Sequence, residues 1–153
     1  MRPLTILCAL FCLATAAVAG AASTDDGLLA VKGGTGSISL AARGSFIGRC
    51  QSDCKIVVLD PDSTDAPPIV RGWDNKINAS TIKTIYSGDN VRFRLVDGFY
   101  RLLIRGTGID VSAVGQGTVV LNGNGGFDDG TYSLNAGPWL SLPDQLKSFQ
   151  LAG

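Results

Sequence analysis

The alternation of apolar and polar residues in one segment constrains the fold more than any other feature of this chain. The segment "VRFRLVDGFYRLLIR", residues 91–105, is apolar at every second position on each side of Asp97-Gly98. A period of two is typical of strands with one buried face, and Asp-Gly favours a two-residue hairpin turn because both residues tolerate positive φ. We therefore predict a hairpin in which Arg94 lies opposite Arg101. Its buried face would consist of Val91, Phe93, Leu95, Tyr100, Leu102 and Ile104.

The other face of this predicted hairpin gathers positive charge. Its basic residues are Arg92, Arg94, Arg101 and Arg105. One interpretation is a solvated outer face on which arginine stems cover Phe99 and Leu103. The alternative is a site for an anionic partner, because guanidinium groups bind carboxylates and phosphates bidentately. Nucleic acid is not expected, since the basic stripe is short and the chain has 13 basic against 13 acidic residues.

Short segments with strand-like composition follow one another along most of the chain, separated by turns rich in Gly, Pro and Asp. This pattern predicts an all-β fold, a single antiparallel β-sandwich or small β-barrel of about nine to eleven short strands. One short helical turn is expected within "SLPDQLK", residues 141–147. Besides the hairpin, the expected strands are 28–31, 36–42, 46–50, 54–59, 69–73, 81–86, 109–114, 118–121, 131–134 and 149–151.

The first residues have the features of an export signal. Arg2 precedes the apolar run "LTILCALFCLATAAV", which ends at small residues suitable for cleavage. We interpret residues 1–21 as a signal peptide and residues 22–153 as a single all-β domain, secreted or otherwise extracytoplasmic. An uncleaved N-terminal anchor is the alternative. No later apolar run is long enough to cross a bilayer, so no transmembrane span is expected after cleavage.

Two cysteines remain after the predicted signal peptide, Cys50 and Cys54. They flank the three residues Gln51-Ser52-Asp53 between two strand-like runs, so they are expected to form a disulfide across a hairpin. The C-x-x-x-C spacing argues against a redox motif. Two thiolates without any imidazole argue against zinc.

Catalysis has little support in the composition. The chain contains no histidine, so no side chain titrates near neutral pH without a perturbed pKa. We expect no catalytic residues and no enzyme, although an aspartate-dependent glycan hydrolase remains a third alternative. Trp73 and Trp139 are interpreted as core residues rather than as a sugar-stacking platform. No cofactor is expected, and calcium has only weak candidate ligands in oxygen-rich loops, namely Asp60, Asp62, Asp65, Asp128 and Asp129.

Over residues 28–151 the chain resembles a group of secreted β-rich proteins from actinobacteria with no assigned function. The segments that carry the resemblance are "IGR", "LDPD", "VRG", "YSGDNVRFRLVDGFYRLLIRGTGIDVSAVGQGTVVLNG", "DDGTYSL" and "SLPD". The resemblance implies export and an all-β domain, and it supplies no functional residues. The cysteine pair departs from that group, in which a plain glycine turn is often found.

These observations together predict a secreted, non-catalytic β domain. Its arginine face would bind an anionic partner, such as a cell-envelope polymer or an extracellular protein. The alternative is a purely structural or accessory domain without a ligand.

Overall fold

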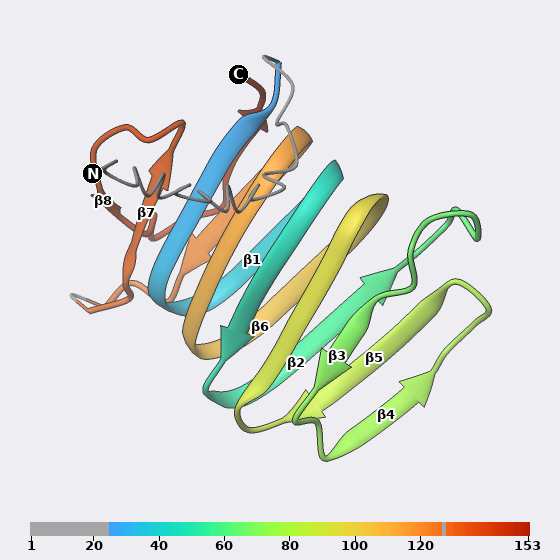
Figure 1. Ribbon diagram of the computed structural model, residues 1–153. Coiled ribbons are helices and arrows are strands. Elements are labelled where there is room, and N and C mark those ends of the chain that lie inside the picture. Colours follow the sequence, from blue (N-terminus) through green and yellow to red (C-terminus); the bar gives the residue numbers. More distant parts are fainter. Residues whose placement is uncertain (1–24, 127) are drawn as a thin grey trace, which may run out of the picture.

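The computed structural model describes residues 25–126 and 128–153, which form one antiparallel sheet of nine strands (Figure 1). The all-β class is confirmed, and the described residues contain no helix. The sheet does not close into a barrel. The predicted signal peptide lies outside the described residues. The strands are β1 (Gly27–Cys50), β2 (Ser52–Leu59), β3 (Ile69–Arg71), β4 (Asn75–Asn78), β5 (Lys83–Gly88), β6 (Val91–Gly123), β7 (Thr131–Leu134), β8 (Leu140–Ser141) and β9 (Lys147–Leu151).

Two long strands, β1 and β6, fold the sheet over on itself into two facing layers (Figure 1). Residues 36–49 of β1 pair along one edge with residues 92–106 of β6 and along the other with residues 110–123. Both strands therefore pass from one layer to the other, instead of being divided into the separate short strands that we predicted. The front layer of Figure 1 comprises residues 27–34, 45–50, 91–95 and 109–115 with β3, β7 and β8. The back layer comprises residues 36–43, 98–106 and 117–123 with β2, β4, β5 and β9.

Glycines make the bends between the layers possible. Gly44 and Gly115 pair with each other where β1 and β6 bend together. Their φ angles are 154° and 153°, a region that residues with a Cβ rarely adopt. A Cβ on Gly44 would collide with the carbonyl oxygen of Val114, and one on Gly115 with that of Arg43. This bend therefore requires glycine on both strands.

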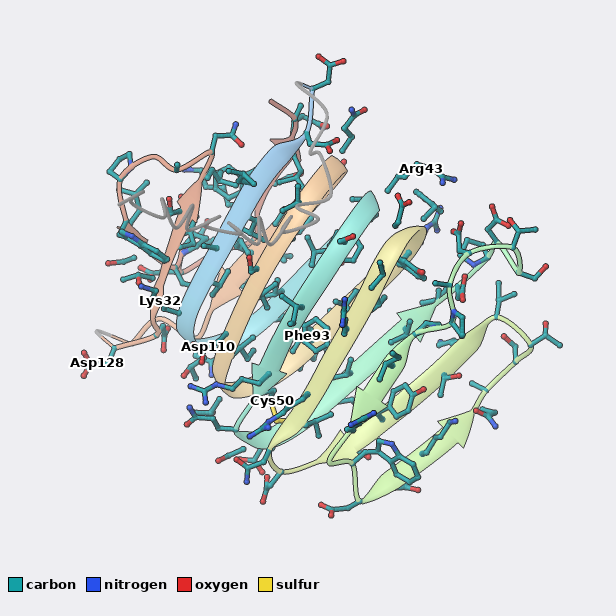
Figure 2. All side chains as sticks on the ribbon, viewed as in Figure 1. Lys32, Arg43, Cys50, Phe93, Asp110 and Asp128 are labelled. Carbon is teal, nitrogen blue, oxygen red and sulfur yellow. A yellow bond between two sulfur atoms is a disulfide. The ribbon has the colours of Figure 1, made fainter. Side chains whose placement is uncertain are left out.

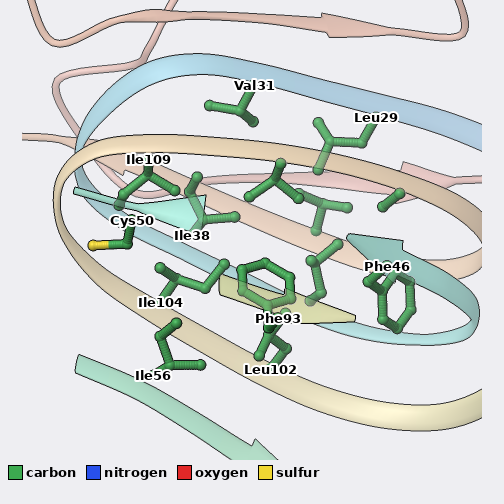
Figure 3. Close-up of a cluster of buried hydrophobic side chains, with 14 of the residues drawn as sticks. Leu29, Val31, Ile38, Phe46, Cys50, Ile56, Phe93, Leu102, Ile104 and Ile109 are labelled. Atoms are coloured by element: carbon green, nitrogen blue, oxygen red, sulfur yellow. The ribbon is translucent and has the colours of Figure 1, made fainter. Parts of the chain in front are cut away.

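The core lies between the two layers and is built from alternate residues of each strand (Figure 3). From the front layer come side chains such as Leu29, Phe46 and Phe93, and from the back layer Ile38 and Leu102. The six apolar residues of segment 91–105 that we expected to be buried are all in this core, so the alternation was interpreted correctly.

The predicted hairpin turn at Asp97-Gly98 is wrong. β6 continues through these residues along the same partner strand, because Leu95 pairs with Phe46 and Gly98 pairs with Gly44. Two residues of β6, Val96 and Asp97, therefore lie opposite the single residue Ser45 of β1, which is a β-bulge. The positive φ of Asp97, 48°, belongs to this bulge at the bend rather than to a turn.

The disulfide between Cys50 and Cys54 is confirmed, with the two Cα atoms 5.8 Å apart. Its setting differs from the prediction, because β1 and β2 are not paired with each other. Cys50 pairs with Val91 in the front layer, while the next residues enter β2 in the back layer. The disulfide thus spans a crossing between layers and not a hairpin. The helical turn predicted at residues 141–147 is also wrong, since this segment contains only bends between β8 and β9.

Candidate anion-binding face

The outer face of the front layer carries a hollow of about 920 Å³, which we call the cationic groove. Its side chains form two rows that run across the strands, because residues paired in neighbouring strands point to the same face. The first row contains Lys32, Asp110, Arg49, Arg92 and Arg71, and the second contains Ala30, Ser112, Ile47, Arg94 and Ile69. Figure 2 places Lys32 and Asp110 near one end of this layer and Arg43 near the opposite end.

Asp110 is the only carboxylate among the described residues that line the groove. Its Oδ2 accepts a hydrogen bond from Arg49 Nε at 2.7 Å, and its Oδ1 accepts one from the backbone N–H of Gly33 at 2.8 Å. Partial burial raises the pKa of Asp110, but these hydrogen bonds and the charges of Arg49 and Lys32 outweigh burial and lower it. Asp110 is therefore ionised at neutral pH and is already engaged by Arg49.

Three further arginines of the groove have no such partner. The salt bridges among the described residues are Arg43–Asp65 and Arg49–Asp110, so Arg71, Arg92 and Arg94 take part in none. Arg92 pairs with Arg49 on one side and with Arg71 on the other. Like charges directly opposite each other destabilise a sheet, and this repulsion would be relieved by an anion placed between them.

The second row is mostly apolar, although it lies on the outside of the protein. Ile47 is 56 % exposed and Ile69 is 48 % exposed. Arg94 lies between them, paired with Ile47 in β1 and with Ile69 in β3. The groove therefore offers uncovered aliphatic surface beside the cations.

The predicted site residues are divided between the two faces. Arg92 and Arg94 lie in the cationic groove, whereas Arg101 and Arg105 lie on the outer face of the back layer. Arg101 pairs with Ala41 and Leu59, so the expected Arg94–Arg101 pairing is wrong. The bend at the β6 bulge explains the division, because it carries the chain from one layer to the other.

Sequence reasoning missed three cations of the groove, namely Lys32, Arg49 and Arg71. Each lies at an outward position of a short alternating segment, such as "FIGRC" for Arg49 and "IVR" for Arg71. The alternation therefore indicated which way each residue points. Which strands lie side by side was not readable from the segments, since it depends on long-range pairing.

On the back face the arginines flank an apolar row that is covered next to them and exposed only at its far end, at Ile77 in β4. Val57 points outward from β2 and pairs with Leu103 and Ile85, yet it is only 8 % exposed. Arg101 and Arg105 occupy the outward positions on either side of Leu103. Their long stems are suited to cover this apolar row while the charged ends stay in water.

Three of the five aspartates proposed as weak calcium ligands, Asp62, Asp65 and Asp129, already accept hydrogen bonds from the protein. Asp62 Oδ1 accepts hydrogen bonds from the backbone N–H and the hydroxyl of Thr64, which lower its pKa. Asp65 accepts a hydrogen bond from the N–H of Phe99, and Asp129 accepts one from that of Gly126. In the described part of the chain, no three or more His, Cys, Asp or Glu residues form a group that could hold a metal ion. Asp128 belongs to no such group either.

Asp60 is the one carboxyl group with a buried oxygen that has no hydrogen-bond partner among the described residues. Burial raises the pKa of Asp60, and the charge of Asp65 adds to this. Asp60 thus differs from Asp62, whose pKa is lowered, and such a contrast is what acid–base catalysis by two carboxyls requires. Neither residue lines the cationic groove.

The interpretation of the two tryptophans as core residues is wrong, since Trp73 is 40 % exposed and Trp139 is 45 % exposed. Trp73 lies 6.3 Å from the ring of Tyr86 in β5. Trp139 lies 4.5 Å from Lys32 Nζ, as a cation–π contact at one end of the groove's first row. They belong to opposite ends of the strand order, so they form no shared platform.

Comparison with family models, curated proteins and solved structures gives no match for this chain. The resemblance to secreted actinobacterial proteins therefore stays a prediction. In the described residues, no helix has the length and apolar character needed to cross a bilayer.

Proposed function

We propose that the protein is an extracytoplasmic binding module, without catalytic activity of its own, that holds an anionic ligand in the cationic groove. The observation that carries this proposal is the row in which Arg49, Arg92 and Arg71 lie abreast on adjacent strands. Adjacent strands are about 4.8 Å apart, so these three side chains leave the sheet from neighbouring positions on the same face. Arg101 and Arg105, which we first expected to share the site, have no part in it.

Retention on immobilised polyphosphate and on purified peptidoglycan tests the proposal. The Arg71→Gln/Arg92→Gln variant should lose retention, while the matched Arg101→Gln/Arg105→Gln variant from the back face should keep it. Retention of the native protein should also weaken as ionic strength rises from about 0.1 M to about 1 M, where the Debye length shrinks to roughly 3 Å.

Equal retention of both double variants would contradict the proposal. If the native protein is retained on neither material and on no other anionic polymer, the alternative of a structural or accessory domain without a ligand gains support. Turnover on a panel of glycans, lost on Asp60→Asn substitution, would instead favour the hydrolase alternative.

A further inference from the structure

We infer that the ligand of the cationic groove is an anionic amphiphile, that is, a carboxylate or phosphate group attached to an apolar chain. This inference rests on the proposed function and goes further, because it assigns different parts of the ligand to the two rows. The charged group would lie over Arg49, Arg92 and Arg71 in the first row. The apolar chain would lie over Ile47 and Ile69 in the second, along the aliphatic stem of Arg94 between them.

The polarity of the groove changes from row to row along the strands. Outward residues of successive rows are two positions apart, which is about 6.5 Å. Beyond the second row, Leu28 and Val114 form an outward pair in the same layer, and Leu28 is 41 % exposed. Beyond the first row, Arg94 is therefore the one cation beside the outward apolar residues Ile47, Ile69 and Leu28, and its aliphatic stem can line the path of an acyl or alkyl chain.

The positive charges of the first row disfavour binding of a second copy of this protein through the same face. In a two-fold contact the same patch is present on both subunits, so Arg92 and Arg71 would approach their own counterparts. Among the residues that the structure describes, the groove lining contains five basic side chains against the single carboxylate of Asp110. An anionic occupant is therefore favoured over self-association.

The apolar row is also the wrong complement for a single-stranded nucleic acid, because base recognition of that kind uses exposed aromatic rings. Phe93 is the only aromatic residue among the described residues of the lining, and it is 3 % exposed. The exposed apolar side chains of the groove are aliphatic. A volume of about 920 Å³ falls within the range of small-molecule sites.

The test measures binding of butyl, hexyl and octyl phosphate by calorimetry, below their aggregation thresholds and beside inorganic phosphate. Burial of each methylene should strengthen binding about fourfold. Octanoate in place of octyl phosphate tells whether the carboxylate or the phosphate is preferred, and octylammonium should not bind.

The variants Ile47→Asn and Ile69→Asn should remove most of the dependence of affinity on chain length. The matched control is Ile77→Asn, at a 51 % exposed isoleucine in β4 outside the groove.

Affinity that does not change with chain length would overturn this inference and leave the proposed function intact, provided that Arg71→Gln/Arg92→Gln still abolishes polyanion retention. The inference also fails if Ile47→Asn and Ile77→Asn reduce octyl phosphate binding equally. If the native protein is neither retained on polyanions nor binds alkyl phosphates, both proposals are overturned. Chain-length dependence that disappears only in the groove variants supports the amphiphile.

Discussion

The two outer faces of this protein carry arginines at the same kind of alternating position, and their surroundings differ. On the back face the outward Val57 is 8 % exposed, whereas on the front face the outward Ile47 is 56 % exposed. The back face also has an exposed isoleucine, Ile77, but it lies at the β4 end of the Val57 row, away from the arginines. The front-face Arg94 lies directly between two exposed isoleucines. A cluster of positive charge on a sheet therefore indicates a binding site only where the neighbouring side chains also leave apolar surface exposed.

The cross-strand partners differ in the same way. Arg92 has a basic residue on each side, Arg49 and Arg71. Arg101 has Ala41 and Leu59, both neutral, in the equivalent places. Arg105, the other back-face arginine, lies opposite Lys55 on one side and the neutral Ser37 on the other. The back face therefore has one like-charge pair at its arginines, whereas Arg92 alone has two, which makes the front face the better candidate for an anion.

The separation of the two faces depends on the bend between layers, and Gly44→Ala should disrupt it. The new Cβ would meet the carbonyl oxygen of Val114 at a backbone conformation unsuited to alanine. We expect a loss of about 3 kcal/mol or more in the free energy of unfolding, measured by urea denaturation. Gly33→Ala is the control, since a Cβ at Gly33 would meet nothing within 4 Å beyond its chain neighbours, although its φ of 59° also adds strain. A loss no larger than that of the control would contradict the role given to this bend.

Removal of the disulfide should come next in size. The Cys50→Ser/Cys54→Ser variant frees the crossing from the front layer to β2 in the back layer. Chain-entropy reasoning for such a short loop gives a loss of roughly 2 kcal/mol. Reductant should lower the unfolding temperature of the native protein to about that of the variant. It should leave the unfolding temperature of the variant unchanged. Unchanged polyphosphate retention is expected, because neither cysteine lines the groove.

The same substitution on the two outer faces should give different results. Val57→Asn places an amide in a covered apolar row and should cost about 1 to 2 kcal/mol of stability. Ile47→Asn alters an exposed side chain and should change stability by less than about 0.5 kcal/mol. Chemical denaturation of both variants measures the two changes in the free energy of unfolding. Equal losses would mean that the two faces do not differ in coverage.

The smallest effect is expected at Asp110. The pKa of Asp110 is lower in the folded chain than in the unfolded one, so its contribution to stability is present above about pH 4 and is lost as pH falls through the folded pKa. Its salt bridge with Arg49 is partly exposed, with side chains 31 % and 54 % accessible, which limits the contribution to below about 1 kcal/mol. Asp110→Asn should remove this part of the acid dependence and should strengthen retention on polyphosphate. Weaker retention would contradict a repulsive role for the carboxylate.

Much of the local structure was predictable from the sequence, and the pairing of distant segments was not. Alternation identified the buried face of residues 91–105 because each side chain's direction is a local property. The Asp97-Gly98 turn failed because the same positive φ serves either a hairpin or a bulge, and the choice depends on where β1 lies. The groove was only half predicted for the same reason, since Arg49 and Arg71 reach Arg92 through strands that are far apart in sequence.

The sharing of β1 and β6 between both layers also has a consequence for folding. Gly27 pairs with Gly115, and residues 36–49 need β6 on both of their edges. The first half of the chain therefore cannot complete its hydrogen bonding until residues up to about 123 are available. We expect slow, cooperative folding in which neither layer forms without the other, so the cationic groove should exist only in the complete domain.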